Sequence, residues 1–235
     1  MLLPIDYEHL TTAQAIAYQH ELRKQIQIKP LQTPIRTIAG ADISFNKHEE
    51  TVYAGIVVFS YPDLKIIGNA TAISRTPFPY ISGLLAFREV PALLEAWNKL
   101  ETKPDLLVLD GQGIAHERRL GIATHFGLIT GATTLGCAKS RLAGNFQEPP
   151  NEAMAESPLY HKGELVGVAL RSKRNCNPLF ISPGNNIDIP QSVEVIKQCL
   201  RGYRMPEPTR QAHLLVNKIR IANGRVPNTQ HDLFS

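Results

Sequence analysis

The sequence contains few cysteines and no long apolar stretch, and these absences exclude several classes of protein. Its three cysteines, Cys137, Cys176 and Cys199, lie far apart, and no two of them form a CxxC pair. The pattern indicates neither a zinc cluster nor a disulfide framework, so a reducing, cytoplasmic location is expected. No stretch is as long as a membrane span, and the first residues lack the basic and apolar segments of a signal peptide. We therefore expect no membrane association and no signal peptide.

The composition is consistent with one large α/β domain. Hydrophobic residues make up 43% of the 235 residues, which is enough for one well-filled core. The formal net charge of +4 is a mild excess that permits nucleic-acid binding without requiring it. We expect residues 1–223 to form a single domain that acts as a monomer, and residues 224–235 to form a flexible tail.

The apolar pattern predicts three strands, then a helix, then two strands that alternate with helices. Segments 37–45, 51–59 and 64–73 are joined by short connections, which predicts an antiparallel meander. A helix is expected from just after Tyr80 to about residue 100, with a kink or break before Pro91. This order predicts a ribonuclease-H-like α/β fold with a mixed five-stranded sheet and flanking helices.

The remaining elements are assigned from the same kind of pattern. Thr11 and Gln14 form a capping-box sequence at the start of an N-terminal helix. The polar, proline-rich segment 145–158 is interpreted as a surface loop. The other predicted elements are strand 106–109, helix 118–126, strand 130–136, a hairpin of 164–170 with 178–182, and helices 191–201 and 209–223.

The buried strand 106–109 runs directly into Asp110, and this segment is the most informative in the chain. Gly111 and Gly113 follow the aspartate and allow a ligand to approach the backbone closely. A carboxylate at a strand end, beside glycines and His116, suits a metal-dependent phosphate site. A tight turn in which Asp110 bonds to its own backbone explains this segment equally well when it is taken alone.

Two further carboxylates favour the metal site. Asp42 lies within the first predicted strand, which neighbours the buried fourth strand in a ribonuclease-H-like sheet. Glu89 has Leu85 and Leu93 as its helical neighbours, and a carboxylate on an apolar face is unfavourable unless it is paired. Two like charges about 4 Å apart repel by ~4 kcal/mol at an effective dielectric of 20, so three converging carboxylates either raise their own pKa values or take up a divalent cation. Hard oxygen ligands select Mg²⁺ or Mn²⁺. Taken singly, Asp42 is also explained as a strand-edge acid, and Glu89 as an ion-pair partner of Arg88.

Longer motifs resemble the endonuclease V family over roughly residues 38–221. These motifs are long and occur in the order in which the family has them. They are AGADISF at 39–45, PYI at 79–81, GLLAFRE at 83–89, DGxGIAHxR at 110–118, GIAxHxG at 121–127, GCAK at 136–139, LxG at 142–144, SPG at 182–184 and TRxAH at 209–213.

The resemblance implies an Mg²⁺-dependent DNA repair endonuclease, with Mn²⁺ as a substitute. Members of the family hydrolyse the second phosphodiester bond 3′ to a hypoxanthine base and leave a 3′-hydroxyl and a 5′-phosphate. By the same resemblance, Asp42, Glu89 and Asp110 would be the metal ligands. Lys139 would contact phosphate near the reaction, and His213 would help to position or activate the attacking water.

The resemblance also implies a group of residues that recognise the damaged base. Tyr80, between Pro79 and Ile81, would be a wedge that fills the space left by a flipped base, because stacking contributes ~1–3 kcal/mol per base. Without the resemblance, Tyr80 would be interpreted as a loop tyrosine that covers the core. His116 would lie beside the lesion pocket. The implied pocket walls, which would read hypoxanthine through backbone groups, are Gly83, Leu85, Gly111 and Ile122.

Three positions depart from the family pattern, and none of them is an implied metal ligand. Ser82 replaces a proline of the wedge and could cap the following helix. Gln112 replaces a histidine, and Glu117 stands where a proline is usual. The negative charge of Glu117 is expected to weaken nucleic-acid binding.

The last residues resemble the short QxDLF peptide by which bacterial repair and replication proteins bind the sliding clamp. The matching residues are Gln230, Asp232, Leu233 and Phe234. An unstructured tail with a Leu-Phe anchor can dock into a hydrophobic pocket as it becomes ordered. The alternative is a tail whose two apolar residues have no partner or pack on the domain.

Several alternatives remain open from the sequence. The basic segment 171–174 is either a grip on the duplex or a solvated turn, and His125 is expected to be a core or capping histidine. The rival functions are a ribonuclease for inosine-containing RNA, a hypoxanthine-binding module that does not cut, and a junction or flap nuclease. Dependence on a 2′-hydroxyl beside the cut would identify the ribonuclease.

Overall fold

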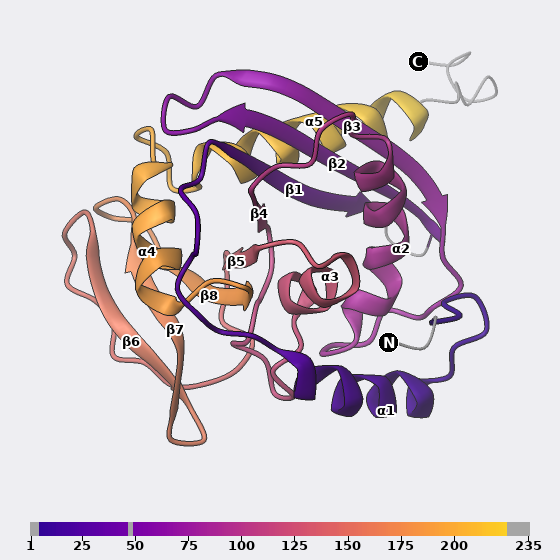
Figure 1. Ribbon diagram of the computed structural model, residues 1–235, viewed down its shortest axis with the longest axis horizontal. Coiled ribbons are helices and arrows are strands. Elements are labelled where there is room, and N and C mark those ends of the chain that lie inside the picture. Colours follow the sequence, from indigo (N-terminus) through magenta and orange to yellow (C-terminus); the bar gives the residue numbers. More distant parts are fainter. Residues whose placement is uncertain (1–4, 47–48, 225–235) are drawn as a thin grey trace, which may run out of the picture.

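One mixed sheet forms the centre of the molecule, with helices against both of its faces (Figure 1). The computed structural model describes residues 5–46 and 49–224. Within these residues, eight strands follow the order β3-β2-β1-β4-β5-β8-β7-β6 across the sheet. The strands are β1 (Thr37–Phe45), β2 (Thr51–Ser60), β3 (Ile66–Arg75), β4 (Leu106–Leu109), β5 (Thr134–Ala138), β6 (Ala155–His161), β7 (Glu164–Arg171) and β8 (Leu179–Asn185).

Side-chain caps fix where two of the helices begin. The Thr11 side chain accepts from the N–H of Gln14, and the Gln14 side chain accepts from the N–H of Thr11, which confirms the predicted capping box. Asp188 caps another helix by accepting from the N–H of Gln191. The helices are α1 (Thr12–Leu22), the short 3₁₀ helix η1 (Arg23–Gln25), α2 (Leu85–Asn98), α3 (Ile122–Thr130), α4 (Ile189–Gln198) and α5 (Glu207–Gly224).

The ribonuclease-H-like order of the first five strands is confirmed. β1, β2 and β3 form the antiparallel meander, and β4 lies parallel to both β1 and β5. The sheet is larger than the five strands predicted, because β8, β7 and β6 continue it beyond β5. β7 and β8 pair antiparallel as the predicted hairpin.

Strand β6 begins within the segment 145–158 that is interpreted as a loop, so that interpretation holds for residues 145–154 and is wrong for 155–158. Ser157 and Leu159 are buried, whereas Glu156 and Pro158 are exposed, so the segment alternates as a strand does. Pro158 is tolerated because β6 is the last strand of the sheet, where one row of backbone groups needs no partner strand. The prolines that precede it concealed this alternation in the sequence.

Helix α2 differs from its prediction at its start and at Pro91. It begins at Leu85 and not just after Tyr80, because the preceding residues form a turn in which the N–H of Leu84 donates to the carbonyl of Ile81. The predicted break before Pro91 is wrong, since α2 continues through it to Asn98. The apolar side chains on both sides of the proline are buried in one cluster, and this packing offsets the lost backbone bond.

Alternating side chains of the strands build one apolar layer on each face of the sheet. Ala39 and Ala41 of β1 belong to the layer covered by α2 and α3. Ile38 of β1 belongs to the opposite layer, which α4 and α5 cover. In the part of the chain that the structure describes, no helix combines the length and the apolar character needed to cross a membrane.

Candidate active site

Strands β1 and β4 bring two carboxylates to the same level of the sheet. The parallel register pairs Ala41 with Leu109, so Asp42 and Asp110 are the next residues on their strands. The N–H of Asp110 donates to the carbonyl of Ala41 at 3.1 Å, which continues the ladder by one bond. The predicted neighbourhood of these two strands is thus confirmed, and the aspartate follows directly where β4 ends.

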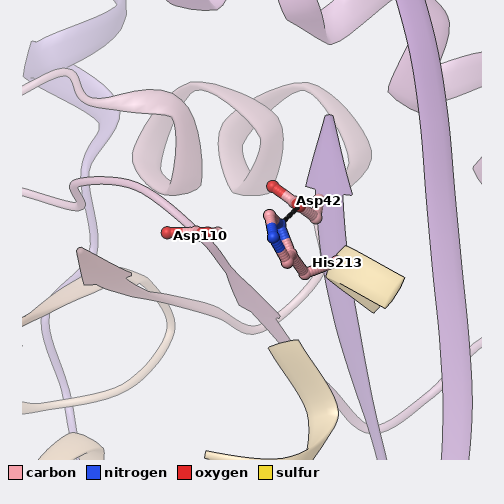
Figure 2. Close-up of side chains that lie close together, drawn as sticks. All are labelled: Asp42, Asp110 and His213. Carbon is pink, nitrogen blue, oxygen red and sulfur yellow. Dashed lines mark hydrogen bonds and ion pairs between the residues drawn. The ribbon is translucent and has the colours of Figure 1, made fainter. Parts of the chain in front are cut away.

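Helix α5 adds a histidine to this pair. A Cβ atom at Gly40 would lie 2.0 Å from the backbone of Pro208, so only glycine lets the start of α5 lie this close to β1. Asp42 is two residues further along the strand and therefore on the same face. His213 Nδ1 lies 2.7 Å from the carboxylate of Asp42. Figure 2 shows these two side chains facing each other, with Asp110 nearby.

Asn217 holds the other side of the His213 ring. It lies one turn further along α5, and its amide nitrogen is 3.0 Å from His213 Nε2. The amide oxygen of Asn217 accepts from the hydroxyl of Ser44 at 3.2 Å, which orients the amide so that its N–H₂ group faces the ring. Asp42 and Asn217 together therefore fix the orientation of the His213 ring. The i, i+4 spacing to His213 is the sequence signal that could have identified Asn217.

Asp42, Asp110 and His213 form a group that can bind a metal ion. Each offers one ligand atom, and these atoms all lie within 4.8 Å of one another. Lys139, which comes directly after β5, places its ammonium 2.5 Å from the carboxylate of Asp110 and partly neutralises it. Two carboxylates and an imidazole are a donor set that suits a divalent cation.

Glu89 lies near this group but contributes no atom to it. It is half-buried on α2 and lines the same pocket as Asp110. Burial raises the pKa of Glu89 to about 8. The negative charges of Asp42 and Asp110 contribute to this rise, whereas the positive charge of nearby Arg88 opposes it. Burial and the charge of Asp110 likewise raise the pKa of Asp42. The ionised forms of Asp42 and Glu89 are thus destabilised at this site, which a bound cation would relieve.

A pocket of about 340 Å³ opens beside the carboxylates. Its size is within the range of ~300–1,000 Å³ that is usual for small-molecule sites. All five residues expected around a lesion base line it, namely Gly83, Leu85, Gly111, His116 and Ile122. Pro79, Tyr80 and Ile81 do not line the pocket but lie on the loop that leads to it. Tyr80 is 64% exposed, and its ring centroid lies 5.8 Å from that of Phe45.

The carbonyl of Gly83 fixes one wall of this pocket. It accepts from Gln19 Nε2 at 2.9 Å, His116 Nε2 at 3.0 Å and Arg118 Nη2 at 3.0 Å. Gly83 has a φ of +79°, and a Cβ atom there would lie 3.0 Å from the Arg118 guanidinium, so glycine is required. Gln19 also accepts from Arg118 Nε and is fully buried, which the sequence did not reveal.

His116 ties the pocket wall to the backbone and is held in one tautomer. Its Nδ1 accepts from the N–H of Arg118 at 3.1 Å, so Nε2 must carry the proton that is donated to Gly83. Burial, together with the charge of Arg118, lowers the pKa of His116 to about 4. Both ring nitrogens are therefore used within the protein, and His116 shapes the pocket by positioning Gly83.

The first turn of α2 presents free donors at the pocket. Among the described residues, the backbone N–H groups of Leu85 and Ala86 have no acceptor. Both residues line the pocket. The expected cap by Ser82 is wrong, because Leu84 occupies the N-cap position and no side chain caps the helix. These two N–H groups can bind an acceptor atom of a ligand.

Several other expectations are resolved by burial. Arg171 of the basic segment is buried, and its guanidinium donates to the carbonyl of Pro150 at 2.8 Å, so only Lys173 and Arg174 remain exposed for a duplex. His125 is a fully buried core residue as expected, and it lies 3.0 Å from the hydroxyl of Tyr7. The tail residues Gln230, Asp232, Leu233 and Phe234 lie outside the described residues.

The chain is similar to known proteins of one family. The family model for Endonuclease V matches residues 20–214. Endonuclease V from Dehalococcoides mccartyi is 44% identical over 205 residues, which cover 87% of this chain and 92% of that protein. The crystal structure of endonuclease V from Bacillus subtilis is 32% identical, with a TM-score of 0.88 and coverage of 94% of this chain and 96% of that chain.

A third comparison contains a nucleic acid. The structure of Ciona intestinalis endonuclease V in complex with a 23mer DNA, in which an inosine is followed by a ribo-adenosine, has a TM-score of 0.79. It is 25% identical to this chain and covers 91% of this chain and 100% of that chain.

Proposed function

Because this chain belongs to the endonuclease V family, we propose that it is a DNA repair endonuclease for deoxyinosine. It would hydrolyse the second phosphodiester bond 3′ to the hypoxanthine and leave a 3′-hydroxyl and a 5′-phosphate. The observation that carries the proposal is the group formed by Asp42, Asp110 and His213 beside a pocket of about 340 Å³. A base-sized pocket next to a cation site is what recognition and cutting of a damaged strand require.

The proposed metal ligands are Asp42, Glu89 and Asp110, with Mg²⁺ as the ion and Mn²⁺ as a substitute. The residues fit such an ion, since burial and the charges of Asp42 and Asp110 raise the pKa of Glu89 to about 8. Hard carboxylate oxygens are the ligands these ions prefer. When bound, the ion would lower the pKa of a water and neutralise charge at the scissile phosphate.

Lys139 would contact the phosphate, and His213 would position the attacking water. Lys139 is bound to Asp110, and its side chain is 37% exposed, so it can turn towards a phosphate when the carboxylate has another partner. The His213 side chain is 43% exposed, and its ring is fixed by Asp42 and Asn217. A ring fixed in this way can hold a water in one orientation.

Recognition of hypoxanthine would combine backbone donors with exclusion by shape. The free N–H groups of Leu85 and Ala86 can donate to the 6-oxo group of the base. Close walls at Gly83, Gly111 and Ile122 would exclude the 2-amino group that guanine carries and hypoxanthine lacks. Tyr80, exposed on the loop before α2, would stack in the space that the flipped base leaves.

A ribonuclease activity on inosine-containing RNA is the second candidate. It is favoured by the Ciona intestinalis complex, in which the inosine is followed by a ribo-adenosine. The test compares duplexes that carry one inosine with deoxyribose throughout, or with one ribose at the neighbouring 3′ position. Cutting of the all-deoxy duplex at a comparable rate supports the DNA function, whereas cutting of only the ribose-containing strand supports the ribonuclease.

Binding without cutting is less favoured by the residues present. A protein that only binds hypoxanthine has no need to bring carboxylates together, because their repulsion is unfavourable for folding. A junction or flap nuclease would cut undamaged branched DNA as well as inosine DNA, which the same assay measures. The monomeric state and the cytoplasmic location remain predictions.

The C-terminal residues 230–235 are proposed to bind a sliding clamp. Deleting them should abolish clamp binding and leave the nicking of short oligonucleotides unchanged, because the tether only raises the local concentration of enzyme at replicated DNA. Full clamp affinity in the shortened protein would refute this partner.

A further inference from the structure

Gln112 places a buried amide at the pocket with an unpartnered oxygen. The residue is 8% exposed and lines the pocket together with Leu85 and Ala86. Its Nε2 donates to the backbone carbonyl of Ser140 at 2.8 Å. A carbonyl can only accept, so the amide nitrogen must face Ser140 and Oε1 must face away from it. Among the described residues, no donor reaches Oε1.

An unpartnered buried acceptor in a pocket points to a donor on the ligand. Such an oxygen is unfavourable for the folded protein, and buried polar groups without a partner are rare enough to need an explanation. The bond to Ser140 prevents the amide from simply exchanging its two ends. Gln112 thus holds an acceptor in a fixed position within the wall of the pocket that Leu85 and Ala86 also line.

We propose that Gln112 Oε1 accepts a hydrogen bond from the ring N–H of a deaminated base. This inference rests on the proposed function and specifies which atoms the pocket reads. Hypoxanthine carries a hydrogen on N1, whereas N1 of adenine is itself an acceptor. An acceptor on the protein therefore attracts the deaminated base and repels adenine. Uracil carries the same oxo group beside a ring N–H and has no group at the position of the 2-amino group of guanine that the walls exclude, so it belongs to the same substrate class.

The amide of Gln112 suits this role better than the imidazole of a histidine would. An imidazole can accept only through an unprotonated nitrogen, and that capacity is lost when the ring is protonated. An amide oxygen accepts at every pH at which the protein is folded. Gln112 is therefore a specificity-determining residue by its chemistry as well as its position.

The test measures a ratio of rates in three proteins. The wild type, Gln112→Met and Gln112→Glu cut duplexes that carry either deoxyinosine or deoxynebularine, which lacks both the 6-oxo group and the N1 hydrogen. Methionine removes the acceptor, whereas glutamate keeps an acceptor oxygen and loses the donation to Ser140. The ratio of the two rates cancels any uniform effect of the added charge on DNA or metal binding.

The expected result is a ratio that falls about tenfold in Gln112→Met and stays within about threefold of the wild type in Gln112→Glu. An unchanged ratio in Gln112→Met would overturn the inference. An equal fall of the ratio in both variants would also overturn it, because that result is expected if Gln112 acts only through its bond to Ser140. The same ratio is measured for binding in EDTA by fluorescence anisotropy. If the protein binds inosine DNA without cutting it, the proposed function is refuted, but the ratio of binding affinities still tests the role of Gln112.

Discussion

Asn217 holds the ring of His213 on the side opposite Asp42, and this contact can be tested on its own. Replacing Asn217 with alanine frees Nε2 and lets the ring rotate. We expect the kcat for nicking to fall about tenfold with little change in KM, because the loss concerns orientation and not DNA binding. The matched control is Asn223→Ala, which removes an exposed asparagine of the same helix. Equal activities of the two variants would contradict the role of Asn217.

His125 should make the stability of the protein depend on pH. Burial lowers the pKa of His125 to about 3, against about 6.5 in the unfolded chain, so between these values only the unfolded state takes up the proton. Its contribution is complete above pH 6.5 and is lost as the pH falls towards 3. The stability of the wild type relative to His125→Leu should therefore fall by roughly 2 kcal/mol between pH 8 and pH 5. Urea unfolding at several pH values measures this, with His20→Leu as the exposed control; a relative stability that stays constant or rises towards pH 5 would contradict it.

At the scale of elements, α1 supports the pocket although it lies far from the carboxylates in the sequence. Gln19 reaches from α1 to the carbonyls of Gly83 and Leu120. Gln19→Ala should loosen the Gly83 wall and reduce the preference for inosine over adenosine DNA by about tenfold. Gln25→Ala, an exposed position just after α1, is the control and should keep the preference. Rates measured on the two substrates decide the question, and an unchanged preference in Gln19→Ala would contradict it.

The strands that carry Asp42 and Asp110 could be predicted because their signals are local. An apolar run and short connections identify each strand, and the order of a ribonuclease-H-like sheet then makes the two neighbours. The start of α2 could not be predicted, since it depends on a turn that Gly83 forms with a positive φ. The same holds for β6, whose pattern is interrupted by a proline that only an edge strand tolerates.

At the scale of the whole molecule, a divalent cation should stabilise the fold. The ion binds the folded state, where the carboxylates converge, and not the unfolded chain, where they are apart. At about 100 times the Kd, Mg²⁺ should raise the free energy of unfolding by ~2.7 kcal/mol. Thermal unfolding with and without EDTA measures the effect. The Asp42→Asn, Asp110→Asn double variant should show no increase, whereas the exposed control Asp63→Asn should respond as the wild type does.

The assembled pocket goes beyond what the sequence could reveal. Its walls come from α2, from the segment after β4 and from the segment after β5, and Gln19 braces it from α1. Contacts over such separations depend on how the helices lie on the sheet, and no local pattern encodes them. The same reason explains why the sequence did not show that His213, and not Glu89, joins Asp42 and Asp110 in one group.

The central claim is that the group around Asp42 and Asp110 cuts DNA beside an inosine. The most direct measurement maps the ends produced from an end-labelled duplex with one deoxyinosine, using the wild type, Asp110→Asn and the control Asp63→Asn. We predict an Mg²⁺-dependent nick at the second phosphodiester 3′ to the inosine in the wild type and the control, slowed roughly 10²–10³-fold in Asp110→Asn. Equal cutting by Asp110→Asn, or equal cutting of a duplex without inosine, would contradict the account.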